Sequence, residues 1–213
     1  MQSIHKQIED IIKRKRRGNV FFASDFKSLG SGDAIRQVLS RLCKEDFIVR
    51  LSNGIYLYPK ISKHIGIIYP SIEEIAKAIA RKEKARLIPT GVFALNKLGL
   101  STQVPMKVVF LTDGAPRVVK VGKKATVHFK KTVAKYLAFK GSISTLVVFA
   151  LKEIGKGNAT ETELQKIKEA LINETPENIT HDAVLAPEWI AEILLKLKKS
   201  ETSITKSAAK EQD

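Results

Sequence analysis

Cysteine and long hydrophobic runs are what this 213-residue sequence has least of. The single Cys43 cannot form an internal disulfide, and with four scattered histidines it offers no zinc-ligand spacing. The longest apolar stretches, such as residues 147–151, are far shorter than the roughly 20 residues of a membrane-spanning helix. The first residues also lack the apolar segment of a secretory signal. We therefore expect a cytoplasmic protein with no membrane partner.

Acidic side chains are also fewer than basic ones, 22 against 37, and the excess of basic side chains is unevenly distributed along the chain. Residues 1–63 carry 13 basic and 6 acidic side chains, residues 64–152 carry 16 and 4, and residues 153–213 carry 8 and 12. The formal net charge is +15, and the 44% hydrophobic content is enough for a packed core. The first two thirds therefore favour a polyanionic partner such as nucleic acid, while the last third has another role.

The first 63 residues follow the pattern of a small DNA-binding domain. Apolar spacing predicts a helix over 3–16, a short strand over 20–22, a second helix after Ser24 and a third from about 33 to 45. Two β-rich runs, 47–51 and 55–58, follow around Asn53-Gly54, a dipeptide typical of tight hairpin turns. This order is typical of a winged helix-turn-helix, with the hairpin as the wing.

The polar face of helix 33–45 is the candidate DNA-reading surface. A helix fits the major groove of B-DNA, where arginine and amide side chains can recognise guanine and adenine. The side chains expected to face the bases are Arg36, Gln37, Ser40 and Arg41. Those expected at phosphates or on the wing are Lys13, Arg14, Lys15, Arg16, Arg17, Ser31, Lys44, Arg50 and Asn53.

Residues 64–199 predict a second domain, basic and mixed α/β, with helices at its C-terminal end. A connector over 59–68 leads into a helix over 71–84 that begins with the capping-box spacing of Ser71 and Glu74. Strands are expected over 106–112, 117–121 and 125–129, and helices follow from residue 143. Two of the strands alternate apolar and basic side chains, which suggests a basic patch of Lys123, Lys124, Lys130 and Lys131. Residues 200–213 are polar and aperiodic, so we expect a disordered tail. The predicted fold class is α+β.

Three stretches of the chain carry a more specific signal. They are Pro89-Thr90-Gly91 with Ala94-Leu95-Asn96 and Gly99-Leu100-Ser101-Thr102-Gln103-Val104-Pro105, then Ser40-Arg41-Leu42, and Gly54-Ile55-Tyr56. Together they resemble the AbiE-type abortive-infection antitoxins of type IV toxin–antitoxin systems, over about residues 10–140. The resemblance implies an N-terminal winged helix that binds operator DNA with inverted repeats and represses its own operon. It also implies a second domain that counteracts a nucleotidyltransferase-type toxin.

Enzymatic interpretations have less support in the sequence. No Gly-rich phosphate loop, metal-binding HExxH or Gly-x-Ser-x-Gly motif is present, so we expect no catalytic residue, metal or cofactor. A magnesium-dependent nuclease is the best enzymatic alternative, with Asp113 at a strand end as its candidate ligand. Two further alternatives are a stand-alone winged-helix regulator and a module that binds RNA or protein without a toxin.

Overall fold

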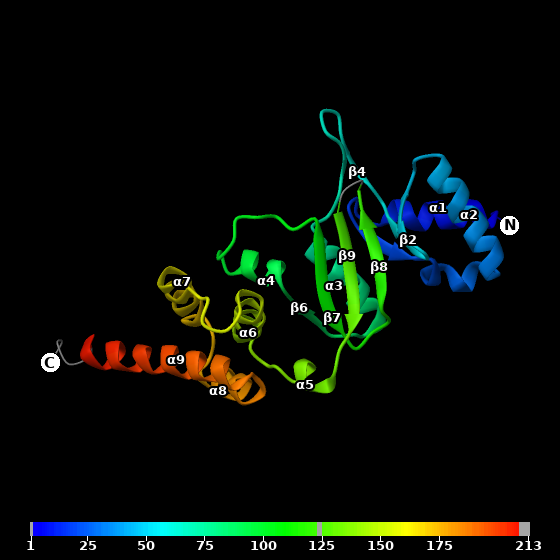
Figure 1. Cartoon of the computed structure of the whole chain (residues 1–213). Coiled ribbons are helices and arrows are strands. Elements are labelled where there is room, and N and C mark those ends of the chain that lie inside the picture. The colour runs from blue at the N-terminus through cyan, green and yellow to red at the C-terminus, as the bar shows by residue number, and fades with distance from the viewer. Residues whose placement is uncertain (1, 123–124, 209–213) are drawn as a thin grey trace. The chain divides into compact units, whose positions relative to one another are not determined.

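The computed structural model describes residues 2–122 and 125–208, and it is mixed α/β with a helical C-terminal end (Figure 1). The chain forms two compact units. The first holds the residues up to Lys84 together with the segment from Val118 to Val127, and the second holds the rest. The first unit is therefore larger than the domain that we expected over 1–63. The segment from Val118 to Val127 belongs to this unit through two contacts. The Ser52 hydroxyl donates to the Val118 carbonyl at 3.2 Å, and Gly122 lies against the Tyr69 ring.

The first unit begins with the predicted order of elements. These are α1 (Ile4–Arg14), β1 (Val20–Phe22), η1 (Ala23–Leu29), α2 (Gly32–Lys44), β2 (Val49–Ser52) and β3 (Ile55–Leu57). The second helix, η1, is a 3-10 helix rather than an α-helix. The strands form an antiparallel sheet in the order β1-β3-β2. Ile8, Phe21, Phe26, Leu39 and Leu42 are at most 1% exposed, so α1 and α2 pack on one core beside this sheet.

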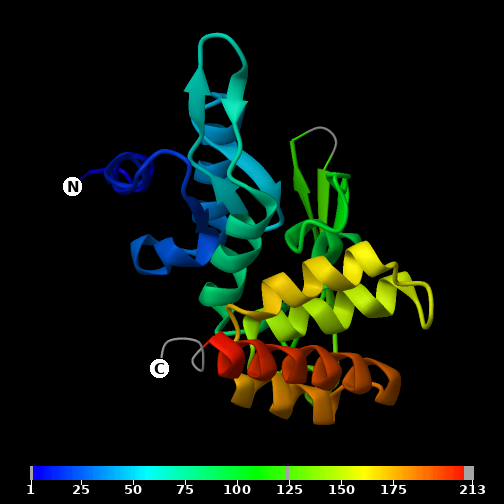
Figure 2. The same ribbon diagram turned by 90° about the vertical axis from the view of Figure 1, so that its left-hand side faces the viewer.

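The connector expected over 59–68 is wrong, because these residues form a second hairpin. It consists of β4 (Lys60–Ser62) and β5 (Gly66–Ile68), a separate two-stranded sheet that Figure 2 shows in cyan. Ile61 pairs with Ile67, and Gly66 closes the turn with a φ of 74° that favours glycine. The helix α3 (Ile72–Glu83) follows, and the predicted capping box of Ser71 and Glu74 is confirmed.

A four-stranded sheet has the order β6-β7-β9-β8. Its strands are β6 (Leu87–Pro89), β7 (Lys107–Thr112), β8 (Arg117–Val121) and β9 (Ala125–Lys131), and the three strands expected from residue 106 are confirmed. Side chains alternate as a half-buried sheet requires: Val108, Phe110, Val127 and Phe129 are buried, whereas Lys107 and Lys130 are exposed. Two short helices, α4 (Val92–Lys97) and α5 (Ala134–Leu137), flank the second unit's strands, and α5 was not predicted.

Four helices complete the second unit: α6 (Ser142–Ile154), α7 (Glu161–Leu171), α8 (Pro176–Leu185) and α9 (Glu188–Ala208). Figure 2 shows these helices in yellow-green to red. Val147, Leu151, Ile167, Ile190 and Leu194 are at most 1% exposed and form the core between them. The disordered tail expected from residue 200 is wrong as far as Ala208, since α9 continues to that residue. Residues 200–208 contain neither glycine nor proline to end the helix. The rest of the expected tail, 209–213, lies outside the described residues. Within the described chain, no helix is both long enough and apolar enough to cross a bilayer.

Candidate nucleic-acid interface

The exposed face of α2 carries all four residues that we expected to face DNA bases. The Ser31 hydroxyl caps the helix by accepting from the Ala34 N–H at 3.3 Å. Ile35, Val38, Leu39 and Leu42 are buried on the inner face. The outer face exposes Asp33, Arg36, Gln37, Ser40, Arg41 and Lys44. Because residues four apart stack on one side of a helix, Arg36 and Ser40 form one strip, and Gln37 and Arg41 form the next.

The β2–β3 hairpin lies beside this helix and presents two further candidates. Its turn is Asn53-Gly54, where Gly54 has a φ of 70°. The Arg50 guanidinium donates to the Asn53 side-chain oxygen at 2.9 Å, which holds the arginine along the hairpin. The turn therefore determines where the Arg50 charge lies.

Helix, hairpin and η1 enclose a hollow of about 760 Å³, which we call the α2 groove. It is lined by Ala23, Ser24, Lys27, Gly32, Ile35, Arg36, Ser40, Cys43, Arg50, Asn53, Gly54 and Tyr56. Three of these side chains are cationic, and no carboxylate is among them. The groove thus brings together Arg36, Ser40, Arg50 and Asn53 from the predicted set, whereas Gln37, Arg41 and Lys44 lie on the neighbouring exposed surface of α2. Lys27 and Ser24 were missed.

The floor of the α2 groove is uncharged. Burial raises the pKa of the Cys43 thiol, and the nearby Arg50 offsets this only in part. Burial likewise raises the pKa of the Tyr56 phenol, again opposed by Arg50. Both groups are therefore protonated at neutral pH, and Cys43 lacks the lowered pKa of a reactive thiol.

The basic run at residues 13–17 lies at the end of α1, and its side chains have different surroundings. Lys13 is ion-paired with Glu9 and lies 5.9 Å from the centre of the Phe47 ring. Arg17 stacks on Tyr58 at 4.7 Å and donates to the Pro59 carbonyl at 3.0 Å. These two side chains are held by the protein itself. Arg14 and Arg16 are exposed and Lys15 is half-buried, so they are the members of the run available to phosphates.

Comparison with known proteins places the chain in a family. A family of unknown function, DUF6088, matches residues 7–179, from α1 into α8. The chain belongs to this family. Among solved structures, the crystal structure of the RV2827C protein from Mycobacterium tuberculosis is similar at 11% identity, covering 91% of this chain and 81% of that chain, with a TM-score of 0.44. No curated protein matches.

The DUF6088 match includes β8 and β9, the strands beside which we predicted a basic patch. Only two of the four lysines of that patch are among the described residues. Lys123 and Lys124 lie outside the described residues. Lys130 and Lys131 are exposed at the end of β9, in the second unit. Asp113, the candidate metal ligand of the nuclease alternative, accepts from the Arg86 backbone N–H at 2.7 Å and from its Nε at 2.9 Å. These hydrogen bonds lower the pKa of Asp113 and engage both of its carboxylate oxygens.

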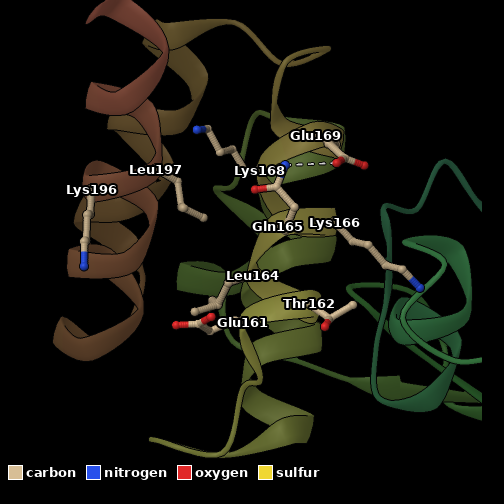
Figure 3. A pocket seen from close by; sticks show the side chains of 9 residues that line it. All are labelled: Glu161, Thr162, Leu164, Gln165, Lys166, Lys168, Glu169, Lys196 and Leu197. Carbon is tan, nitrogen blue, oxygen red and sulfur yellow. Dashed lines mark hydrogen bonds between the residues drawn. The ribbon is translucent and has the colours of Figure 1, made fainter. Parts of the chain in front are cut away.

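Another hollow of this DUF6088 protein, of about 770 Å³, lies between α7 and α9 (Figure 3). Leu164 and Leu197 face each other across it, whereas Lys166 points away toward the Gly99 carbonyl, to which it donates at 3.0 Å. Its remaining polar side chains have mixed charge and do not converge on one point. Over residues 2–122 and 125–208, no three His, Cys, Asp or Glu side chains gather as a metal site would require.

Proposed function

We propose that the protein is a sequence-specific DNA-binding repressor whose first unit acts as a winged helix-turn-helix. The observation that supports this most is the α2 groove, where Lys27, Arg36 and Arg50 meet with no carboxylate among the lining residues. Cations on one face attract phosphates, and hydrogen-bonding side chains on an exposed helix can read base edges. In this proposal α2 enters the major groove and the β2–β3 hairpin is the wing.

Duplex DNA fits this surface better than duplex RNA. The major groove of B-DNA admits an α-helix, whereas that of A-form RNA is deep and too narrow for side chains to read. The exposed residues of α2, which are Arg36, Gln37, Ser40 and Arg41, belong to an α-helix rather than to a platform of aromatic rings. A helix of this kind favours the DNA alternative over single-stranded RNA, which is bound by stacking.

The second half of the proposal is that the protein is the antitoxin of a type IV toxin–antitoxin system. Its support is the resemblance carried above all by residues 89–105, which run from the last residue of β6 through α4 into the loop before β7. Asn96 holds this loop by donating to the carbonyls of Ser101 and Gln103, both at 3.2 Å. The segment is thus an ordered part of the second unit. The resemblance assigns antitoxin action to this second unit. Co-expression with a neighbouring nucleotidyltransferase gene tests it, and we expect growth to be rescued.

DNA binding is tested by fluorescence anisotropy with a labelled duplex from upstream of the gene. If Arg36 and Arg41 contact bases, each change to Ala costs about 1–3 kcal/mol, a loss of roughly 5- to 150-fold in affinity. Lys156→Ala is the matched control, since it removes one exposed positive charge from the second unit. Its affinity should equal that of the parent.

Two results would contradict the proposal. The first is wild-type affinity that does not distinguish the upstream duplex from unrelated DNA of equal length. The second is equal loss in Arg36→Ala and Lys156→Ala, because overall charge rather than the α2 groove would then hold the DNA. If DNA binding is intact but growth is not rescued, the repressor proposal stands and the antitoxin proposal is rejected.

A further inference from the structure

A third hollow, distinct from the α2 groove, lies wholly in the second unit. It has a volume of about 480 Å³ and is bounded by the start of α4, the outer face of β7, the end of β9 and the C-terminal end of α6. Helices α4 and α6 lie side by side in Figure 1, and α4 also contacts β7. We call this hollow the lysine pocket. Its lining residues are Thr90, Gly91, Val92, Phe93, Lys107, Val109, Leu111, Lys130, Phe149, Lys152 and Glu153.

Three lysines from three different elements converge on this pocket. Lys107 comes from β7, Lys130 from β9 and Lys152 from α6, against the single carboxylate of Glu153. The side-chain ammonium groups of Lys107 and Lys130 have no hydrogen-bond or ion-pair partner in the described part of the chain. Lys152 is held in place, since its ammonium donates to the Tyr136 hydroxyl at 2.8 Å and lies 4.4 Å from the centre of that ring. Like charges brought together by the fold repel one another, and an anionic ligand removes that cost.

The positive charges of Lys107 and Lys130 also act on the imidazole of His128 on β9. Burial lowers the pKa of its imidazole, and Lys107 and Lys130 lower it further. The imidazole is therefore neutral at neutral pH and adds no charge of its own. In β9, His128 and Lys130 alternate with the buried Val127 and Phe129, so they share one face of the strand.

Apart from the Thr90 hydroxyl, which donates to the Val109 carbonyl at 3.0 Å, the rest of the pocket is apolar. Val109 and Leu111 of β7 are half-buried and lie on the same face as Lys107, while Phe149 of α6 is 5% exposed. Phe93 packs edge-on against Phe110, with ring centres 5.3 Å apart, and lines the side near α4. Ligand pockets in proteins typically have volumes of about 300–1,000 Å³ and combine apolar walls with a few polar groups.

We propose that the lysine pocket binds a nucleotide, with its phosphate on Lys107 and Lys130 and its base against Val109, Leu111 and the phenylalanine rings. Cationic lysines alone would suit any anion, but the apolar wall requires a ligand that also carries a flat, weakly hydrated part. A duplex is too wide to enter a hollow of this volume. The nucleotide is either free or the exposed end of a single-stranded RNA, because both present the same chemistry. The proposal does not depend on DNA binding by the first unit.

The test is isothermal titration calorimetry of the full chain with ribonucleoside monophosphates and triphosphates and with inorganic phosphate. We expect dissociation constants below about 1 mM for at least one nucleotide and much weaker binding of inorganic phosphate. The double variant Lys107→Gln/Lys130→Gln should bind that nucleotide at least about tenfold more weakly. The matched control Lys135→Gln/Lys140→Gln removes two exposed charges of the same unit outside the pocket and should leave binding unchanged.

The apolar wall is tested by Val109→Phe, which fills the pocket without changing its charge. It should abolish nucleotide binding while circular dichroism shows a folded chain. If this variant does not fold, NMR of the wild type replaces it: nucleotide should shift the His128 imidazole signals and raise the pKa of that ring, because phosphate offsets the lysines. The signals of His181, on α8 and not in the lining, serve as the reference. A single-stranded RNA octamer that competes with the nucleotide and binds more tightly would assign the RNA source, and weaker binding would assign the free nucleotide.

Three results would overturn the proposal. One is the absence of binding by every nucleotide and by the octamer at about 1 mM. Another is equal affinity for inorganic phosphate and nucleotide, which would make the pocket a site for any anion. The last is an equal loss of nucleotide affinity in Lys107→Gln/Lys130→Gln and in Lys135→Gln/Lys140→Gln. Binding would then depend on the net charge of the protein rather than on the lysine pocket.

Discussion

Arg36 lines the α2 groove but is already ion-paired with Asp33, one turn earlier on the same helix. Both side chains are well exposed, at 66% and 83% of their area. An exposed pair of this kind contributes only about 0–1 kcal/mol, so releasing Arg36 to a phosphate or a guanine costs little. The Asp33 carboxylate, however, is also a negative charge on the face that we propose meets DNA.

Replacing Asp33 by Asn should therefore strengthen DNA binding. Asn removes the charge that repels phosphate and frees Arg36, and it remains acceptable near a helix start. We expect affinity to rise about two- to fivefold at low salt, with a smaller gain at high salt because the effect is electrostatic. Anisotropy titrations at two salt concentrations measure it. Glu177→Gln, in the first turn of α8, is the control and should change nothing. Weaker binding by Asp33→Asn would mean that the carboxylate contacts DNA itself.

The start of α6 is crowded by side chains from neighbouring segments. Two carboxylates accept hydrogen bonds from backbone N–H groups at and just before this helix start. Asp182 of α8 accepts from Lys140 and Gly141, both at 2.9 Å. Glu174, in the loop between α7 and α8, accepts from Ile143 at 2.8 Å. Asp182 is fully buried, so these bonds satisfy polar oxygens whose burial would otherwise be costly. Gly141 has an ordinary φ of −78°, yet a Cβ there would lie 2.6 Å from a Glu174 oxygen and closer still to the Ser144 hydroxyl. Space, not backbone conformation, requires this glycine.

Gly141→Ala should consequently destabilise the protein by about 2–4 kcal/mol, because the added methyl displaces carboxylates that hold the helix start. Urea unfolding followed by circular dichroism measures the free energy of unfolding. Gly32→Ala on α2 is the matched control: its Cβ would lie 3.5 Å from the Arg36 side chain, an ordinary contact. We expect that variant to be neutral or up to about 1 kcal/mol more stable, since alanine favours helix. Equal stability of both variants would show that the start of α6 adapts freely.

Elements with strong periodicity or caps can be predicted from the sequence, and weakly patterned ones cannot. The capping box at Ser71 predicts helix α3, and Asn53-Gly54 predicts the β2–β3 turn. The β4–β5 hairpin was missed because its paired residues Ile61 and Ile67 are 61% and 39% exposed, so neither strand has a buried face with the usual alternating pattern. The four-residue α5 is too short to show a period.

At the scale of the whole molecule, the sequence predicts which residue faces outward on one element but not which elements meet. Helical spacing by itself places Arg36 and Ser40 on one exposed strip. Lys27 joins them only because η1 packs beside α2, and Lys107 lines the same pocket as Lys152 only because α6 packs against β6, the strand next to β7. Contacts of this second kind depend on tertiary packing between different elements, so a single sequence does not carry them.

The excess of positive charge over the chain makes a prediction about salt. A protein that neutralises Z phosphates loses affinity with a log–log salt slope of about −0.9Z. Arg14 and Arg16 are exposed at the end of α1, and we expect them to contact phosphates rather than bases. The variant Arg14→Gln/Arg16→Gln should therefore make the slope less negative by about 2 and weaken binding to all duplexes alike. Anisotropy titrations of the upstream duplex and an unrelated duplex, over a series of salt concentrations, measure both effects.

The controls for this prediction separate phosphate contact from net charge. Lys135→Gln/Lys140→Gln removes the same number of charges from the second unit, and its slope should equal that of the parent. Arg36→Ala should behave differently from both, because a lost base contact reduces the preference for the upstream duplex while changing the slope by about 1 at most. A preference lowered in Arg14→Gln/Arg16→Gln would place these arginines at base edges instead, and α2 would then share sequence recognition with the end of α1.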